Sequence, residues 1–108
     1  MKKEMNKNEI YKKLGSFKCV ENMTSSRRNE IPNQFILYFE NGQMFQSYKS
    51  IIAVVFDTWK SKENPYYLGK DWDYSKTTGK YRNDFLNNTK KETLEDLKNE
   101  IAILIEGL

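Results

Sequence analysis

Residues 34–48 constrain the fold most strongly, because they read as two strands joined by a tight turn. Residues 34–40 (QFILYFE) are rich in aromatic and branched side chains, which favour strands. Asn41-Gly42 follows, and this dipeptide favours a two-residue type I′ turn, in which both central residues need positive φ. The pattern predicts a β-hairpin with Asn41 and Gly42 as its loop. The face that we expect to line the core holds Phe35, Leu37, Phe39, Met44 and Tyr48.

Shorter segments predict further strands. Residues 51–56 (IIAVVF) are apolar on both faces, which indicates a central strand. Residues 17–23 and 66–68 are predicted as two more, and the turn-rich residues from Thr58 to Pro65 as a loop. Together these segments predict a small antiparallel sheet of three to five strands.

A C-terminal amphipathic helix is predicted to cover this sheet. Thr89 and Glu92 match the capping box that begins many helices, and Gly107 stands where a helix could end. The apolar stripe of this helix, with 3–4 spacing, is Leu94, Leu97, Ile101 and Leu104.

Two shorter helices complete the prediction. One starts at Thr77 or Thr78 and precedes the C-terminal helix. Another is capped by Asn8 and carries Ile10 and Leu14 on its apolar side. The expected fold class is therefore α+β.

A chain of 108 residues fits one domain, and its 14 % aromatic residues can supply a core. We expect a single domain over residues 1–108, with residues 1–8 flexible. The longest apolar run is residues 51–56, which is too short to span a membrane, and no apolar segment of a secretory signal follows the basic start. The single cysteine, Cys19, is typical of a protein in the reducing cytoplasm.

The sequence lacks the residues of common catalytic sites. It has no His, which removes the usual general base, and its one Cys cannot build a Cys/His zinc site. Its glycines are too scattered for a phosphate-binding loop. We therefore expect a non-enzymatic protein without metal or cofactor. A carboxylate metal nuclease is the alternative, since Asp71 and Asp73 would share one face of a strand and could hold Mg²⁺.

Residues 70–91 mix aromatic and basic side chains, a combination that commonly holds single-stranded nucleic acid. Bases stack on the rings while the cations follow the phosphates. The competing interpretation is that the rings, among them Tyr81 and Phe85 at helical spacing, belong to the core. The candidate binding residues of this segment are Trp72, Tyr74, Lys76, Lys80 and Arg82.

Charge is segregated along the chain, although the net charge is only +3. Residues 70–91 carry six basic residues against three acids, whereas residues 92–108 carry one Lys against five acids. The predicted C-terminal helix would therefore present an acidic face, which could occupy a basic nucleic-acid groove of another protein. The acids of this face are Glu92, Glu95, Asp96, Glu100 and Glu106.

Three segments resemble elements shared by a family of small phage and plasmid proteins of bacteria. They are IPNQF at 31–35, FQSYKSIIA at 45–53 and WDYSKTTGKYRNDFL at 72–86. The resemblance covers roughly the middle half of the chain. It implies a mobile-element setting, in which small non-enzymatic proteins often bind and block a host factor, but it brings no established activity.

We therefore expect a non-catalytic binding protein of mobile-element origin. It would inhibit or modulate a host protein, such as a CRISPR-type defence nuclease, by direct binding. The alternative is a single-stranded nucleic-acid-binding protein that uses residues 70–91. A dimer contact through the C-terminal helix is also open, so we expect a monomer or a weak homodimer.

Overall fold

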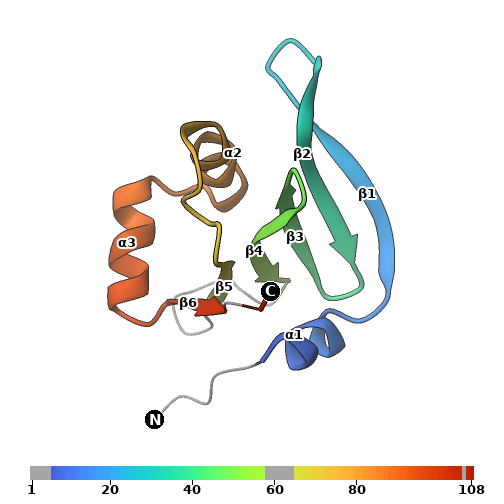
Figure 1. Cartoon of the computed structure of the whole chain (residues 1–108). Helices are drawn as coiled ribbons and strands as arrows, with labels where there is room; N and C mark the ends of the chain where they lie inside the picture. The colour runs from blue at the N-terminus through green and yellow to red at the C-terminus, as the bar shows by residue number, and fades with distance from the viewer. Residues whose placement is uncertain (1–5, 58–64, 106) are drawn as a thin grey trace.

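The computed structural model in Figure 1 describes residues 6–57, 65–105 and 107–108. Within these residues the chain forms one six-stranded sheet, whose strands lie in the order of the sequence. All neighbouring strands are antiparallel except the last two, which are parallel. The strands are β1 (Phe17–Thr24), β2 (Glu30–Phe39), β3 (Gly42–Ser47), β4 (Ser50–Phe56), β5 (Tyr66–Gly69) and β6 (Ala102–Ile105).

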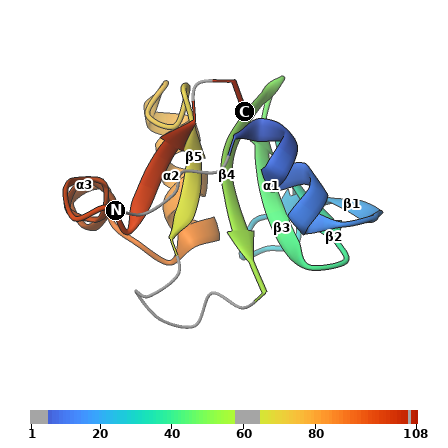
Figure 2. The ribbon, with the colours of Figure 1, turned by 90° about the horizontal axis from the view of Figure 1, so that it is seen from below.

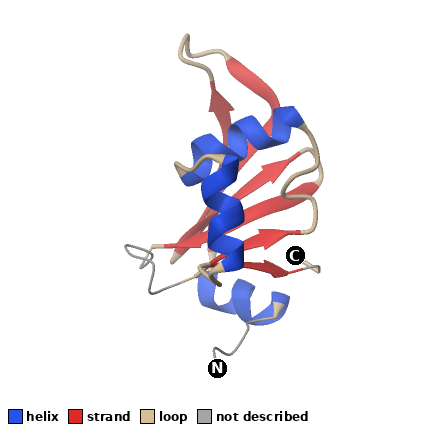
Figure 3. Ribbon diagram, turned by 90° about the vertical axis from the view of Figure 1, so that its left-hand side faces the viewer, coloured by secondary structure: helices blue, strands red, loops and turns tan. Residues whose placement is uncertain are grey.

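Helices pack on both faces of the sheet. The helix α1 (Lys7–Leu14) lies on one side, whereas α2 (Lys76–Leu86) and α3 (Lys90–Lys98) lie on the other (Figure 2). In Figure 3, α2 and α3 cross in front of the strands. No helix among the described residues is long and apolar enough to cross a membrane. The molecule is therefore an α+β domain with a helix layer on each side of its sheet.

Each helix layer covers its own apolar cluster. The cluster under α1 is formed by Ile10 and Leu14 from the helix and by Met44, Val54, Phe56, Tyr67 and Ile103 from the sheet. The cluster under α2 and α3 contains Leu86 and, from the sheet, Ala53, Tyr66, Leu68 and Ala102. Consecutive residues of β4 and β5 thus face opposite cores, which explains why these strands are apolar on both faces.

The predicted hairpin exists, but its turn is shifted. Phe39 pairs with Gly42 and Leu37 with Met44, so the loop residues are Glu40 and Asn41 rather than Asn41 and Gly42. Neither Asn41 nor Gly42 has positive φ. Because the shift displaces the pairing by two residues, the side chains within β2 and β3 keep their predicted faces.

Docking of α1 explains the turn sequence. The Asn41 side chain donates to the carbonyl oxygen of Lys13 over 3.1 Å, and its backbone N–H donates to that of Leu14 over 2.9 Å. A Cβ atom on Gly42 would lie 2.5 Å from the carbonyl oxygen of Val55 and 2.8 Å from Leu14 Cδ2. Asn41 therefore anchors the end of α1, and Gly42 allows the close approach of β4 and the helix.

The predicted core face of the hairpin needs two corrections. Phe45, assigned to the opposite face, is fully buried because it stacks on Phe85 of α2 with ring centroids 5.7 Å apart. Tyr48, assigned to the core face, belongs to the β3–β4 turn and is exposed. Both faces of this sheet are core, and the sequence pattern alone placed the core on only one of them.

The predicted C-terminal helix is correct only for its first half. The capping box of Thr89 and Glu92 is present, but α3 ends at Lys98 and Glu100 takes a φ of 60°. The following residues form β6, which pairs with the otherwise open edge of β5. The apolar residues after Glu100 are compatible with a strand as well as with the apolar stripe of a helix. The long-range pairing with β5 favours the strand.

The other helices differ from prediction at their ends. Ser75 caps α2, which has 11 residues against 9 in α3, so the preceding helix is the longer of the two. Asn6, not Asn8, caps α1, and Ile10 and Leu14 are buried as predicted. The predicted flexible start and the loop after Asp57 lie largely outside the described residues.

The close approach at Gly42 gives a stability prediction. We expect Gly42→Ala to lower the free energy of unfolding by about 2 kcal/mol, because the added methyl overlaps Val55 and Leu14. The measurement is the urea midpoint at constant slope. Gly107→Ala is the control, since no atom lies within 4 Å of its added Cβ. Equal midpoints for the two variants would refute the packing argument.

Candidate functional site

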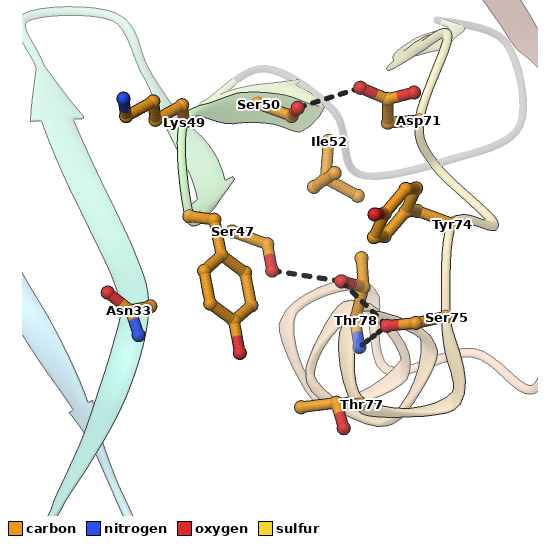
Figure 4. Close-up of a pocket in the computed structure, with 11 residues that line it drawn as sticks. Asn33, Ser47, Lys49, Ser50, Ile52, Asp71, Tyr74, Ser75, Thr77 and Thr78 are labelled. Carbon is orange, nitrogen blue, oxygen red and sulfur yellow. Dashed lines mark hydrogen bonds between the residues drawn. The ribbon is translucent and has the colours of Figure 1, made fainter.

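A cleft of about 740 Å³ lies between the β3–β4 turn and the start of α2 (Figure 4). Most of the residues that line it are of polar types, and they come from three separate parts of the chain. The lining residues are Asn33, Ser47, Tyr48, Lys49, Ser50, Ile52, Asp71, Tyr74, Ser75, Thr77 and Thr78. We call this region the hydroxyl cleft. Each of the segments 31–35, 45–53 and 72–86, which carry the family resemblance, contributes to it.

Hydroxyl groups at the base of the hydroxyl cleft bond to one another. Ser47 and Thr78 share a hydrogen bond of 2.9 Å between their hydroxyl oxygens, and both residues are buried. The Ser75 hydroxyl accepts from the Thr78 backbone N–H over 3.1 Å, as an N-cap does. These contacts join β3 to the first turn of α2 and hold the two walls of the cleft in place.

A β-bulge supplies the apolar floor. Phe45 pairs with Ala53 and Gln46 with Ile51, so Ile52 is left without a partner in β3. Ile52 and Ala53 consequently face the same side of the sheet, and Ile52 lines the hydroxyl cleft while remaining buried. This bulge was not predicted from the sequence.

The β3–β4 turn holds Tyr48 in an unusual backbone conformation. Its φ is 55°, and its N–H donates over 2.7 Å to the carbonyl oxygen of Asn33, whose φ is 65°. A bulky residue in the left-handed region costs about 1 kcal/mol or more, and such residues concentrate at functional sites. The Tyr48 side chain is 53 % exposed.

Tyr74 is the second exposed ring of the cleft. Two turns connect β5 to Tyr74. In the first, the Trp72 N–H donates to the Gly69 carbonyl, and in the second, the Tyr74 N–H donates to the Asp71 carbonyl over 3.0 Å. The Tyr74 side chain is 75 % exposed although the residue lines the cleft. Tyr74 was predicted from the sequence as a binding residue, whereas Tyr48 was assigned to the core face of the hairpin. The position of Tyr48 in the FQSYKSIIA segment was the available signal for a functional role.

A buried amide lies next to the cleft. Gln34 pairs with Ser47 in the sheet and is completely buried, yet neither end of its amide bonds to a described residue. Directly opposite residues of antiparallel strands share a face, so Gln34 lies on the α2 side of the sheet.

A second depression runs along the outer side of α2. Its lining includes Asp73, Ser75, Gly79 and three exposed lysines, Lys76, Lys80 and Lys90. We call it the α2 groove. It shares Ser75 with the hydroxyl cleft, so the two hollows meet at the start of α2. The Lys90 ammonium lies 2.9 Å from an Asp73 oxygen, whereas no acidic side chain of the described residues forms an ion pair with Lys76 or Lys80.

Arg82, a predicted contact residue, is only 1 % exposed. Its guanidinium donates to the Trp72 carbonyl over 2.6 Å, packs 5.0 Å from the Trp72 ring centroid and lies 3.6 Å from Asp73. Burial lowers the pKa of Arg82, and the charge of Asp73 opposes that effect. Arg82 thus ties the 72–73 loop to α2, and Trp72 itself is half-buried against the core.

The acids predicted to form one acidic face are divided by the structure. Glu92 is occupied in the capping box, and Asp96 is buried, where it accepts from the Tyr66 hydroxyl over 2.7 Å. Burial, with the Asp96 carboxylate, raises the pKa of Tyr66. Glu95 and Glu100 are exposed, and Glu106 lies outside the described residues. The remaining charges of α3 are Lys90, Lys91 and Lys98, so its surface is mixed.

The described residues contain no group of three or more acids or cysteines that could hold a metal ion. Asp71 and Asp73, the pair considered for Mg²⁺, have separate partners. Asp71 accepts from the Ser50 hydroxyl over 2.7 Å, whereas Asp73 pairs with Arg82 and Lys90.

These features define a small α+β domain with a polar cleft and a lysine-lined groove at one helix terminus. The chain belongs to a family of unknown function, DUF8033, whose profile matches residues 18–101. The matched region contains every lining residue of the hydroxyl cleft, but neither α1 nor β6. No curated protein and no solved structure matches the chain.

The contacts of Arg82 predict a structural role. We expect Arg82→Met to lower the free energy of unfolding by about 2–3 kcal/mol, because it leaves the Trp72 carbonyl without its donor and removes one of the two cations that pair with Asp73. Urea denaturation measures this loss. Lys80→Met is the control and should change stability by less than about 0.5 kcal/mol, because Lys80 is exposed. An Arg82→Met variant of unchanged stability would contradict this role.

Proposed function

We propose that the protein is a non-catalytic binding protein and that its ligand is single-stranded nucleic acid, held around the start of α2. The observation that supports this most directly is the pair of exposed rings, Tyr48 and Tyr74, on the hydroxyl cleft. Exposed cations stand beside them, namely Lys49, Lys76 and Lys80. Bases stack on aromatic rings while cations follow the phosphates, and this combination tolerates any sequence.

The balance of charge at this surface supports an anionic ligand. Asp73 is paired with Lys90 and Arg82, whereas Asp71 and Asp84 keep their negative charge. The exposed lysines of this surface, Lys49, Lys76 and Lys80, outnumber these two acids. The positive end of the helix dipole adds to this local field.

The contacts inside the cleft support a structural role for three of its hydroxyl groups. The hydroxyls of Ser47, Ser75 and Thr78 bond to one another, and no carboxylate or amine of the described residues bonds to them, whereas the Ser50 hydroxyl donates to the Asp71 carboxylate. A nucleophilic hydroxyl needs a base within hydrogen-bonding distance. We assign these hydroxyls to the architecture of the cleft.

The test is fluorescence anisotropy with a short fluorescein-labelled oligothymidylate at low salt. We expect binding that weakens with salt, because bound phosphates release counterions. Replacing Lys76 and Lys80 together by Ala should weaken binding about tenfold or more and reduce the salt slope by roughly one per lysine.

The matched control replaces Lys12 and Lys18 by Ala, which removes the same charge from α1 and β1. It should leave affinity nearly unchanged. Absence of binding at low salt, or an equal loss in both double variants, would reject the assignment of this surface.

The second candidate function is the inhibition or modulation of a host protein, such as a CRISPR-type defence nuclease. The resemblance to phage and plasmid proteins suggests this setting, and one structural observation favours a protein partner. The eight-residue strand β1 forms one edge of the sheet, and its Phe17 and Val20 side chains are about half exposed. An exposed edge strand can pair with a strand of another chain.

This candidate is tested by affinity capture of the tagged protein from host lysate, with and without nuclease treatment. A host protein that survives nuclease and is lost with Val20→Lys would support recognition through β1. Leu94→Lys, which charges a similarly exposed apolar residue on α3, is the control and should retain the partner. Loss of every captured protein after nuclease would instead favour the nucleic-acid assignment.

A further inference from the structure

We infer that the hydroxyl cleft is a pocket for a single unpaired nucleobase, which stacks on Tyr74 and directs its pairing edge toward Asp71. This inference rests on the proposed nucleic-acid function and makes it more specific. The lysines of the α2 groove would hold the backbone of any sequence, whereas the cleft would select one base.

The cleft has room for one base, and its lining combines apolar and polar groups. Its volume of about 740 Å³ falls in the range of roughly 300–1,000 Å³ that is typical of small-molecule sites. Such sites combine an apolar surface with a few polar groups that determine orientation. Here Ile52 of β4 provides the apolar floor, and Tyr74, from the segment before α2, adds an exposed ring to the lining (Figure 4).

The Asp71 carboxylate is positioned to accept hydrogen bonds from the edge of a base in the cleft. One of its carboxylate oxygens accepts from the Ser50 hydroxyl over 2.7 Å, which restrains the side chain at the upper end of the wall that carries Tyr74 (Figure 4). The other oxygen has no partner among the described residues. A carboxylate only accepts hydrogen bonds, so it favours a base that presents donors.

Because the carboxylate only accepts hydrogen bonds, the four bases are expected to differ in affinity for the cleft. Guanine presents two adjacent donors on its pairing edge, which match the two-oxygen geometry of a carboxylate. Adenine and cytosine present one amino group beside an acceptor, and thymine and uracil present one N–H between two carbonyl oxygens, which the carboxylate repels. We therefore assign guanine as the preferred base and thymine or uracil as the least favoured.

The surrounding charges are compatible with a nucleotide in this position. The exposed Lys49 lines the cleft, and the exposed Lys76 lies in the adjoining α2 groove, next to Ser75, which both hollows share. The phosphates before and after an inserted base could each meet a lysine. Tyr48, held outward by its left-handed backbone, offers a second ring for a neighbouring base.

The experiment compares oligothymidylate with the same oligonucleotide carrying one central guanine, by competition anisotropy. We expect the guanine to tighten binding roughly fivefold or more. Asp71→Asn should abolish this preference, because its amide repels one of the two donors. Asp84→Asn is the control: it removes the same charge in the α2 groove, outside the cleft, and should keep the preference.

A second readout reports stacking. With 2-aminopurine in place of the guanine, binding should quench the fluorescence of the base in the unchanged protein. Tyr74→Leu should remove the quenching and weaken binding roughly fivefold or more, as expected for one base–ring contact. Folding of each variant is checked by its urea midpoint.

The outcomes separate the two proposals. If oligothymidylate binds but the guanine changes neither affinity nor fluorescence, or if both Asp variants behave alike, the base pocket is refuted and the nucleic-acid function stands. If no oligonucleotide binds at low salt, both proposals fail. A guanine preference lost only in Asp71→Asn and quenching lost in Tyr74→Leu would establish the pocket.

Discussion

Burial of both faces of one short sheet is the constraint on which the rest of the structure depends. The middle strands β4 and β5 contribute Val54 and Tyr67 to the cluster under α1, and Ala53 and Leu68 to the cluster under α2 and α3. Helices therefore cover both faces of these middle strands, whereas β1 at the edge stays exposed along most of its length. Binding is left to the ends and edges of the sheet, where turns and helix termini meet.

In the hydroxyl cleft, one set of residues holds the structure together and another set is exposed for contact with a ligand. The hydroxyls of Ser47 and Thr78 are buried and satisfied by one another, so they join a strand to a helix. Tyr48 and Tyr74 are anchored only through their backbones, and their rings face outward. Rigid polar contacts below and exposed rings above form a surface that is already organised before a ligand arrives.

Local sequence signals predicted those elements that local interactions determine. The capping box at Thr89, the central strand at 51–56 and the hairpin around residue 41 were all recognisable. The hairpin register was not, because Asn41 and Gly42 serve the docking of α1 and not a type I′ turn. The strand β6 was taken for helix, because its identity depends on the distant edge of β5.

The candidate site was only partly accessible from sequence for a related reason. Charge and aromatic content selected Tyr74, Lys76 and Lys80, which are exposed, but also Arg82 and Asp96, which are buried. Composition does not reveal which charged side chains have internal partners. The contribution of the β3–β4 turn depends on a bulge at Ile52 and on the positive φ of Tyr48, neither of which has a glycine or another local marker.

The parallel pairing of β5 and β6 has a kinetic consequence. Tyr66 pairs with Ala102, so α2 and α3 both lie inside the long loop that this pairing closes. The hairpins from β1 to β4 need only short loops, and loop-closure entropy favours their earlier formation. One wall of the hydroxyl cleft belongs to these early hairpins and the other to the late loop. The binding surface is therefore expected to be among the last parts of the molecule to assemble during folding.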